Sequence, residues 1–257
     1  YTQNHFALQN ISLDIYEGEI LSIIGCNGSG KSTMLHIICG LIFSQKGKYL
    51  FKNQLINETT LKDSKFNQEF RKAIGYIFQN SDDQLFCPTV IDEIVFGPLQ
   101  AGISKDESYK RAFEVMEMLG ITELKDRPTY MLSGGEKKRV AIGSILSVNP
   151  SILVLDEPLS GLDPRSRSFI IELIFNLNKI GKTIIIATHL LELVQHYQSR
   201  VAVLSENHTI AKIGNVNEVL SDVELLKNCN LIDEYPHQHG KELHRHLLTG
   251  FLFHKHQ

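Results

Sequence analysis

The most informative part of this sequence is Gly25-Cys26-Asn27-Gly28-Ser29-Gly30-Lys31-Ser32-Thr33. It fits the phosphate-binding loop pattern G-x-x-x-x-G-K-[ST] at every fixed position. The apolar run at residues 19–24 is typical of a buried strand, and residues 34–39 are a predicted helix that stops at Gly40. A strand, a glycine-rich loop and a helix in this order indicate a phosphate site in an α/β fold.

The chemistry of this loop is that of a nucleotide site. Its glycines let successive backbone N–H groups point toward phosphate oxygens, and the following helix adds unpaired amides and its positive dipole end. Lys31 is placed to reach the β- and γ-phosphates, and the Ser32 hydroxyl to ligate Mg²⁺. The alternative is an ordinary glycine-rich turn. We predict nucleoside triphosphate binding by Gly25, Asn27, Gly28, Ser29, Gly30, Lys31, Ser32 and Thr33.

Composition excludes several classes of protein. The chain has 257 residues, of which 42% are hydrophobic, so it can bury a large core. Its formal net charge of -3 gives no general basic footprint, and we expect no nucleic-acid partner. The longest apolar runs are too short to span a bilayer. Four cysteines without a C-x-x-C pair fit a reducing compartment.

Patterns along the chain suggest three regions. Residues 11–15, 48–52 and 74–78 are predicted strands of a mixed, partly antiparallel front portion. Residues 85–150 are predicted to form a helical subdomain, in which Ser104 caps a helix with Glu107 three residues later. Buried strands and helices return at residues 151–205, which indicates a parallel sheet.

A second acidic element is Ile152-Leu153-Val154-Leu155-Asp156-Glu157-Pro158. A strand that ends in a carboxylate beside a phosphate loop completes Mg²⁺ binding in such folds. We assign Asp156 to the metal and Glu157 to the orientation and activation of the attacking water. The alternative is an ordinary strand that runs into a loop.

A third element is Leu132-Ser133-Gly134-Gly135-Glu136, in which Ser133 and Glu136 form a helix capping box. Two glycines are costly in a first helical turn. They make sense where an anion must approach bare backbone amides.

These elements together resemble the ABC-type ATPases over roughly residues 1–230. The family's motifs occur in family order at residues 25–33, Gln79, residues 132–136, residues 152–157, residues 160–163 and His189. The resemblance implies a P-loop NTPase with a RecA-like parallel core sheet, an antiparallel β subdomain and an inserted helical subdomain. It also implies a homodimer or heterodimer of ATPase subunits, in which Ser133, Gly134 and Gly135 of one subunit close over the ATP of the other.

The same resemblance implies further roles. Gln79 would contact the metal and report on the membrane partner, and His189 would contact the γ-phosphate; alone, each could be a polar residue at a strand end. Tyr1 is the candidate for stacking on adenine, with Phe6 the alternative. Cys26 stands where the family commonly has Pro, and it supplies no side chain that phosphate or metal needs.

A subfamily resemblance begins at Gln79-Asn80-Ser81-Asp82-Asp83-Gln84-Leu85-Phe86 and continues through Thr89-Val90 to Phe96-Gly97-Pro98. It is similar to the cobalt/nickel and energy-coupling-factor importers. That implies docking, partly through residues 84–96, on an integral membrane coupling protein that also carries a substrate-capture component. The chain would then lie peripherally on the cytoplasmic face of the cell membrane.

The chain ends in a histidine-rich tail at residues 233–257, which we separate from the ATP-binding domain at residues 1–232. Six histidines in three H-x-H pairs fall here: His237, His239, His244, His246, His254 and His256. Such tracts bind Ni²⁺, Co²⁺ or Zn²⁺, or are simply solvated. The tail favours nickel or cobalt as cargo over a vitamin. A soluble ABC ATPase acting on DNA or ribosomes is the distant alternative.

Overall fold

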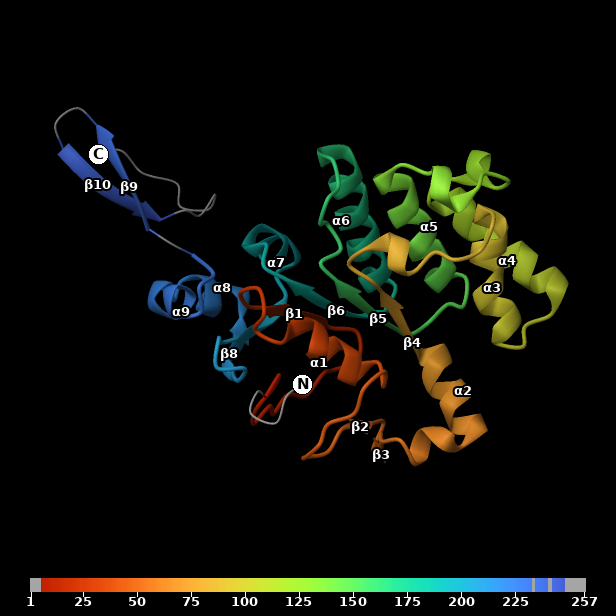
Figure 1. Cartoon of the computed structure of the whole chain (residues 1–257), viewed down its shortest axis with the longest axis horizontal. Coiled ribbons are helices and arrows are strands. Elements are labelled where there is room, and N and C mark those ends of the chain that lie inside the picture. The colour runs from red at the N-terminus through yellow and green to blue at the C-terminus, as the bar shows by residue number, and fades with distance from the viewer. Residues whose placement is uncertain (1–5, 233, 240–241, 248–257) are drawn as a thin grey trace. The chain divides into compact units, whose positions relative to one another are not determined.

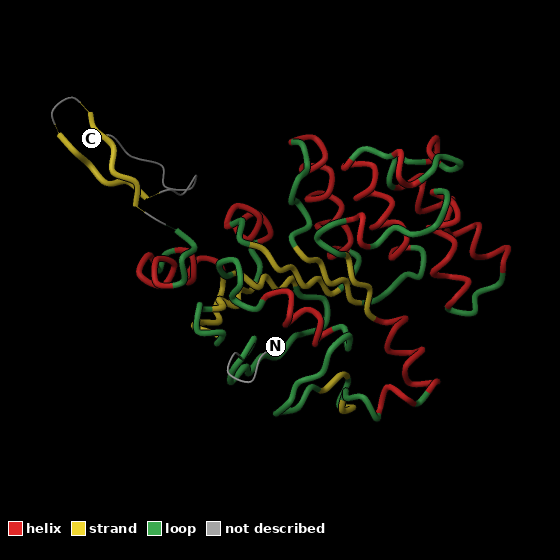
Figure 2. The backbone as a smooth tube through the Cα atoms, viewed as in Figure 1, coloured by secondary structure: helices red, strands yellow, loops and turns green. Residues whose placement is uncertain are grey.

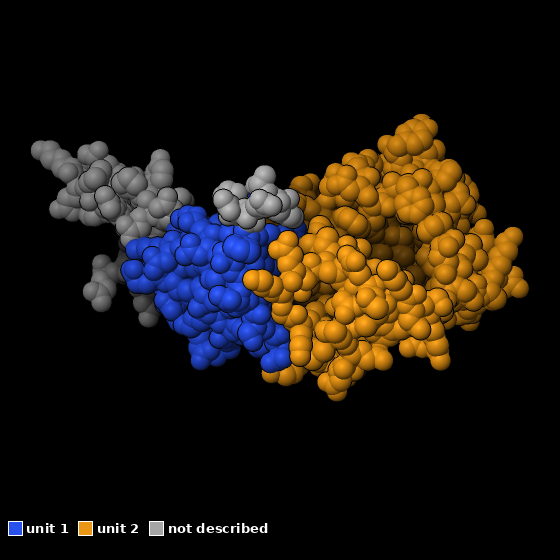
Figure 3. Space-filling model, turned by 60° about the horizontal axis from the view of Figure 1, so that its bottom comes forward, with its two compact units in different colours: residues 1–15, 19–34, 187–257 blue, residues 16–18, 35–186 orange. Residues whose placement is uncertain are grey.

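The computed structural model describes residues 6–232, 234–239 and 242–247, and the chain divides into two compact units (Figure 3). Unit 1 comprises residues 1–15, 19–34 and 187–257, and unit 2 comprises residues 16–18 and 35–186. No helix within the described ranges is long and apolar enough to cross a membrane.

The strands of unit 1 begin with β1 (Ile20–Ile24), whose five residues are all buried. It pairs in parallel with β7 (Arg200–Leu204), and β8 (Ile210–Asn215) runs antiparallel to β7. The helices that begin or lie in this unit are α1 (Lys31–Ile38), α7 (Leu191–Tyr197), α8 (Val216–Leu220) and α9 (Val223–Asn228).

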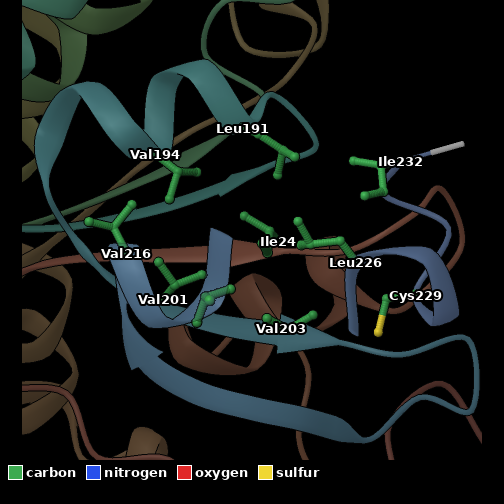
Figure 4. Close-up of a cluster of buried hydrophobic side chains, with 10 residues drawn as sticks. Ile24, Leu191, Val194, Val201, Val203, Val216, Leu226, Cys229 and Ile232 are labelled. Carbon is green, nitrogen blue, oxygen red and sulfur yellow. The ribbon is translucent and has the colours of Figure 1, made fainter. Parts of the chain in front are cut away.

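A hydrophobic cluster holds the strands and helices of unit 1 together (Figure 4). Ile24, at the end of β1, is fully buried in it with Val194 of α7 and Val203 of β7. Burial of one such side chain contributes about 2 kcal/mol. Because Ile24 directly precedes Gly25, this cluster anchors the start of the phosphate loop. Its members are Ile24, Leu191, Val194, Val201, Val203, Val216, Val219, Leu226, Cys229 and Ile232.

The buried strands that lie wholly or largely in unit 2 fall in regions predicted to contain strands. β4 (Ile74–Ile77) pairs in parallel with β5 (Ile152–Asp156), and β6 (Thr183–Thr188) is the next neighbour of β5. Near-continuous burial of these strands is what a parallel sheet with covered faces requires. Helix α6 (Pro164–Lys179) begins after Asp163, whose carboxylate caps it by accepting a hydrogen bond from the Ser166 amide.

Three helices of unit 2 pack against one another: α3 (Val90–Gln100), α4 (Lys105–Met118) and α5 (Gly134–Leu146) (Figures 1 and 2). They lie within the range predicted to be helical. They pack closely at Gly143 of α5, where a Cβ atom would lie 3.0 Å from Leu119 and 3.3 Å from Ile94. The remaining elements of this unit are α2 (Ser64–Ala73), β2 (Leu50–Phe51), β3 (Gln54–Leu55) and the short helical turns Thr60–Lys62, Ser81–Asp83, Thr122–Leu124 and Thr129–Met131.

The structure corrects one sequence prediction and extends another. Residues 11–15 were predicted as a strand but form none, and the Asp14 carbonyl accepts a hydrogen bond from the Arg200 guanidinium instead of a ladder neighbour. The tail, for which no structure was predicted, contains β9 (Glu234–His239) and β10 (Glu242–Leu247), which pair antiparallel.

Candidate functional site

The phosphate loop of unit 1 requires glycine for two different reasons. Gly28 and Gly30 have φ angles of 83° and 105°, which side chains rarely adopt. At Gly28 a Cβ atom would meet nothing within 4 Å, so only the backbone conformation demands glycine. At Gly30 a Cβ would lie 2.4 Å from the Ala7 carbonyl oxygen, so space demands it as well.

Lys31 lies folded back on this loop. Its ammonium group donates to the carbonyl oxygens of Gly25 at 2.9 Å and Cys26 at 3.1 Å. The side chain is buried against the loop. The hydroxyl of Ser29 is also buried and has no hydrogen-bond partner in the described part of the chain. A cation and an unsatisfied donor in one loop fit an anionic ligand.

Two further predicted residues belong to unit 1. His189 directly follows β6 and is exposed, while the Leu190 amide donates to the Thr188 hydroxyl at 3.1 Å and shapes the turn. Phe6 is 58% exposed, so it is not a core residue. Tyr1, the other candidate for stacking on adenine, lies outside the described residues.

The acidic pair of unit 2 stands at the end of β5. Asp156 and Glu157 are both buried, and burial raises the pKa of Tyr76, whose hydroxyl stays protonated and donates to Asp156 Oδ2 at 3.3 Å. Asp156 Oδ1 is buried without a hydrogen-bond partner among the described residues. An orphaned carboxylate oxygen suits a hard cation such as Mg²⁺. Glu157 has a φ of 41°, a strained conformation of the kind that clusters at active sites.

Gln79, two residues after β4, is exposed. Its backbone is held by Lys138, a residue to which the sequence analysis assigned no role. The Lys138 ammonium donates to the carbonyl oxygens of Phe78 and Gln79, each at 2.9 Å. The Gln84 side chain accepts from the Phe78 amide at 3.2 Å and donates to the Ala141 carbonyl at 2.7 Å. Helix α5 is thus tied to the segment that carries Gln79.

Lys138, to which the sequence analysis gave no role, is a buried residue of α5. Its side chain is only 2% exposed. Burial lowers the pKa of this lysine from 10.5 to about 8, against an opposing effect of the nearby Asp156 charge. No local pattern reveals this, because the carbonyls that bind Lys138 come from residues about 60 positions earlier.

The predicted capping box at the start of α5 is present. Ser133 Oγ accepts from the Glu136 amide, and the Glu136 carboxylate accepts from the Ser133 amide at 2.7 Å. The two glycines between them differ. A Cβ at Gly135 would lie 2.6 Å from Ser166 Oγ, whereas a Cβ at Gly134 would meet nothing within 4 Å. Packing inside the unit explains Gly135, and no described residue explains Gly134.

The structure therefore groups the predicted residues within each unit. The phosphate loop and His189 belong to unit 1. Gln79, Asp156, Glu157 and the Ser133 turn belong to unit 2, where Lys138 hydrogen-bonds to the backbone beside Gln79 and interacts with Asp156.

Comparison with known proteins identifies the family. Residues 8–160 match the family model described as ABC transporter. The energy-coupling factor transporter ATP-binding protein EcfA of Methanocaldococcus jannaschii is 42% identical over 90% of this chain and 81% of its own length.

Two solved structures are similar as well. The cbiO1 protein of Clostridium perfringens, part of the ABC transporter complex cbiONQ, has a TM-score of 0.75 and 37% identity over 90% of each chain. A dimeric ATP-binding cassette in a post-hydrolysis state with ADP and Pi has a TM-score of 0.73 and 31% identity over 82% of this chain and 90% of that one.

These matches confirm the predicted fold, with its parallel core strands, small antiparallel sheet and helices, and the predicted ATPase activity. The chain belongs to the ATP-binding proteins of the ABC transporter family, as an ATPase subunit of the energy-coupling-factor type.

Proposed function

We propose that this chain powers an energy-coupling-factor importer as one of two ATPase subunits that close head to tail over two ATP molecules. The observation that carries the proposal is Gly134. It opens α5, and a Cβ placed there would meet no described residue within 4 Å, so a ligand can approach the start of the helix. Bare amides at a helix N-terminus bind phosphate oxygens. The dimeric relative bound to ADP and Pi supports the proposal that these phosphate oxygens belong to a nucleotide held by a second subunit.

Each subunit would bind ATP with its own phosphate loop. The loop amides and Lys31 would hold the β- and γ-phosphates, and Tyr1 would stack on adenine. Oxygens of Ser32, Gln79 and Asp156 would hold Mg²⁺, which when bound neutralises charge on the phosphates. The free Oδ1 of Asp156 supports this role, since Mg²⁺ takes oxygen ligands.

Hydrolysis would depend on residues that act on the attacking water and on the γ-phosphate. Glu157 would orient the water and accept its proton, and His189 would donate a hydrogen bond to the γ-phosphate. Gln79 would sense both the metal and the membrane partner. Lys138 would fix the backbone beside Gln79, because it binds the two carbonyls there.

The membrane partner would be an integral coupling protein that also carries a substrate-capture component. Phe86 and Phe96 support a docking role, because they are 67% and 40% exposed and pack edge to face with ring centroids 4.9 Å apart. Exposed aromatic pairs of this kind are typical of the core of a protein interface. The chain would then act at the cytoplasmic face of the cell membrane.

Nickel or cobalt ions are the cargo that we propose, on the basis of the histidine-rich tail. A vitamin or another small molecule is the alternative cargo. The test is to purify the chain with its bound membrane components and measure ATP-dependent uptake of radioactive nickel, cobalt and vitamins into vesicles. Nickel or cobalt uptake that stops in the Glu157→Gln variant supports the proposal. Uptake of a vitamin without either metal would contradict the proposed cargo, and absence of any membrane component would contradict the importer.

A further inference from the structure

The hairpin of β9 and β10 arranges the histidines of the tail in register (Figure 1). His237 is directly opposite His244, His239 is opposite Glu242, and His246 is opposite Tyr235. The strands are separated by only two residues in the sequence, which is the length of the tightest hairpins.

This register places all four histidines of the hairpin on one face. Directly opposed residues of an antiparallel pair share a face, and so do alternate residues along each strand. His237 and His244 therefore form the central row, with His246 in the row on one side and His239 beside Glu242 in the row on the other. The opposite face takes Glu234, Pro236, Gln238, Leu243, Arg245 and Leu247.

The arrangement depends on the register and not only on composition. A slip of one residue moves the whole set of one strand to the other face. His237 and His239 would then lie on one face and His244 and His246 on the other. In the observed register all four histidines lie on the same face.

The spacing suits a metal ion. Opposed positions in a hairpin lie about 5 Å apart at Cβ, and successive positions on one face of a strand are about 6.7 Å apart. An ion that sits about 2 Å from each imidazole nitrogen can bridge positions this close. Neutral imidazole is a preferred ligand of Ni²⁺, Co²⁺ and Zn²⁺, and carboxylate completes many such sites.

We propose that this face of the hairpin is a binding site for a divalent late transition metal ion, centred on His237 and His244 and completed by His239, His246 or Glu242. Among the residues whose side chains the structure describes, 6–232, no other group of metal-ligating side chains is gathered in this way. The proposal does not depend on the cargo of the transporter, since a metal can bind here whatever the membrane components carry.

The experiment compares variants of identical composition. The full-length chain is stripped with EDTA, and binding of Ni²⁺ and of Zn²⁺ is measured by titration calorimetry at pH 7.5 without nucleotide. One variant exchanges neighbours on β9 (His237→Gln with Gln238→His), and another does so on β10 (His244→Arg with Arg245→His). Each moves one histidine to the opposite face and keeps the histidine count and the net charge. The control exchanges neighbours beyond the hairpin (His254→Lys with Lys255→His).

Each hairpin exchange should weaken metal binding by about tenfold or more, because loss even of outer-shell partners of a metal costs about 10–100-fold. The control should bind as the original chain does, and all variants should bind ATP with unchanged affinity, which shows that they are folded. Binding should also weaken from pH 7.5 to pH 5.5, since imidazole must be neutral to ligate. Equal metal affinity in the hairpin exchanges and the control would overturn the site. Metal binding would then depend only on the number of histidines in the tail. Failed metal uptake by the transporter would contradict the cargo alone.

Discussion

Replacement of Lys138 by Met should change how the stability of the chain depends on pH. Lys138 is a buried cation whose pKa falls from 10.5 to about 8 on folding, mainly because burial penalises its charge. Between these values the unfolded chain binds more protons than the folded chain, so stability rises with pH. The full difference of about 2.5 units corresponds to about 3 kcal/mol at 1.36 kcal/mol per unit.

The measurable part of this effect lies between pH 7 and pH 9.5. Integration of the proton uptake over that range gives a gain of about 2 kcal/mol in the free energy of unfolding from Lys138 alone. Lys138→Met removes the gain because nothing at that position titrates. It also leaves the carbonyls of Phe78 and Gln79 without their donor, at about 1–3 kcal/mol each. At pH 7 this loss of stability opposes the gain from removing a buried charge. The change in the free energy of unfolding with pH is therefore more informative than its value at one pH.

The assay is urea unfolding of the chain, of Lys138→Met and of Lys137→Met at pH 7 and pH 9.5, with EDTA and no nucleotide. Lys137 is the matched control, because it is the adjacent lysine and pairs with Asp82 at the surface. From pH 7 to pH 9.5, the free energy of unfolding of the original chain and of the control should rise by about 2 kcal/mol more than that of Lys138→Met. The same gain in all three proteins would refute the buried-cation role of Lys138.

Other predictions concern the nucleotide site. Gly30→Ala should lower the melting temperature and abolish ATP binding, because the added Cβ would collide with the Ala7 carbonyl oxygen. Gly28→Ala should cost only about 1–2 kcal/mol of backbone strain, because only its φ angle requires glycine. Equal melting temperatures of the two variants would contradict the crowding at Gly30. Glu157→Gln should keep ATP binding, lose at least about 100-fold in turnover and give an ATP-dependent dimer in light scattering; unchanged turnover would remove Glu157 from the reaction. Gly134→Ala should stabilise the chain by up to about 1 kcal/mol in urea unfolding and yet reduce turnover; full activity would show that no nucleotide approaches this turn.

The core strands and helix starts were predictable because their signals are local. The buried runs at β5 and β6 and the caps at Asp163 and Ser133 depend on neighbouring residues in the sequence. The alternating pattern at residues 11–15 has the same local appearance, but a strand also needs a ladder partner, and that is a property of the tertiary fold.

The candidate site was predictable as a set of motifs and less so as an arrangement. Gly134 and Gly135 are adjacent glycines that the sequence alone does not distinguish. The position of Ser166 shows that Gly135 is closely packed and Gly134 is open. The role of Lys138 likewise depends on carbonyls far away in the chain. Register is also tertiary information, so the shared face of His237 and His244 was not visible in the H-x-H pattern.

In the proposed dimer, Gly134 of one subunit acts on ATP held by Lys31 of the other. The most direct test mixes two variants, Lys31→Ala and Gly134→Gln, each expected to be inactive alone. Gly134→Gln should fold and bind ATP, because a Cβ at this position meets nothing within 4 Å. Random pairing makes half of the dimers mixed, each with one intact site, so turnover should recover to about a quarter of the original. No recovery from two folded variants that pair with each other, or full activity of Gly134→Gln alone, would contradict the action of Gly134 on the nucleotide of the other subunit.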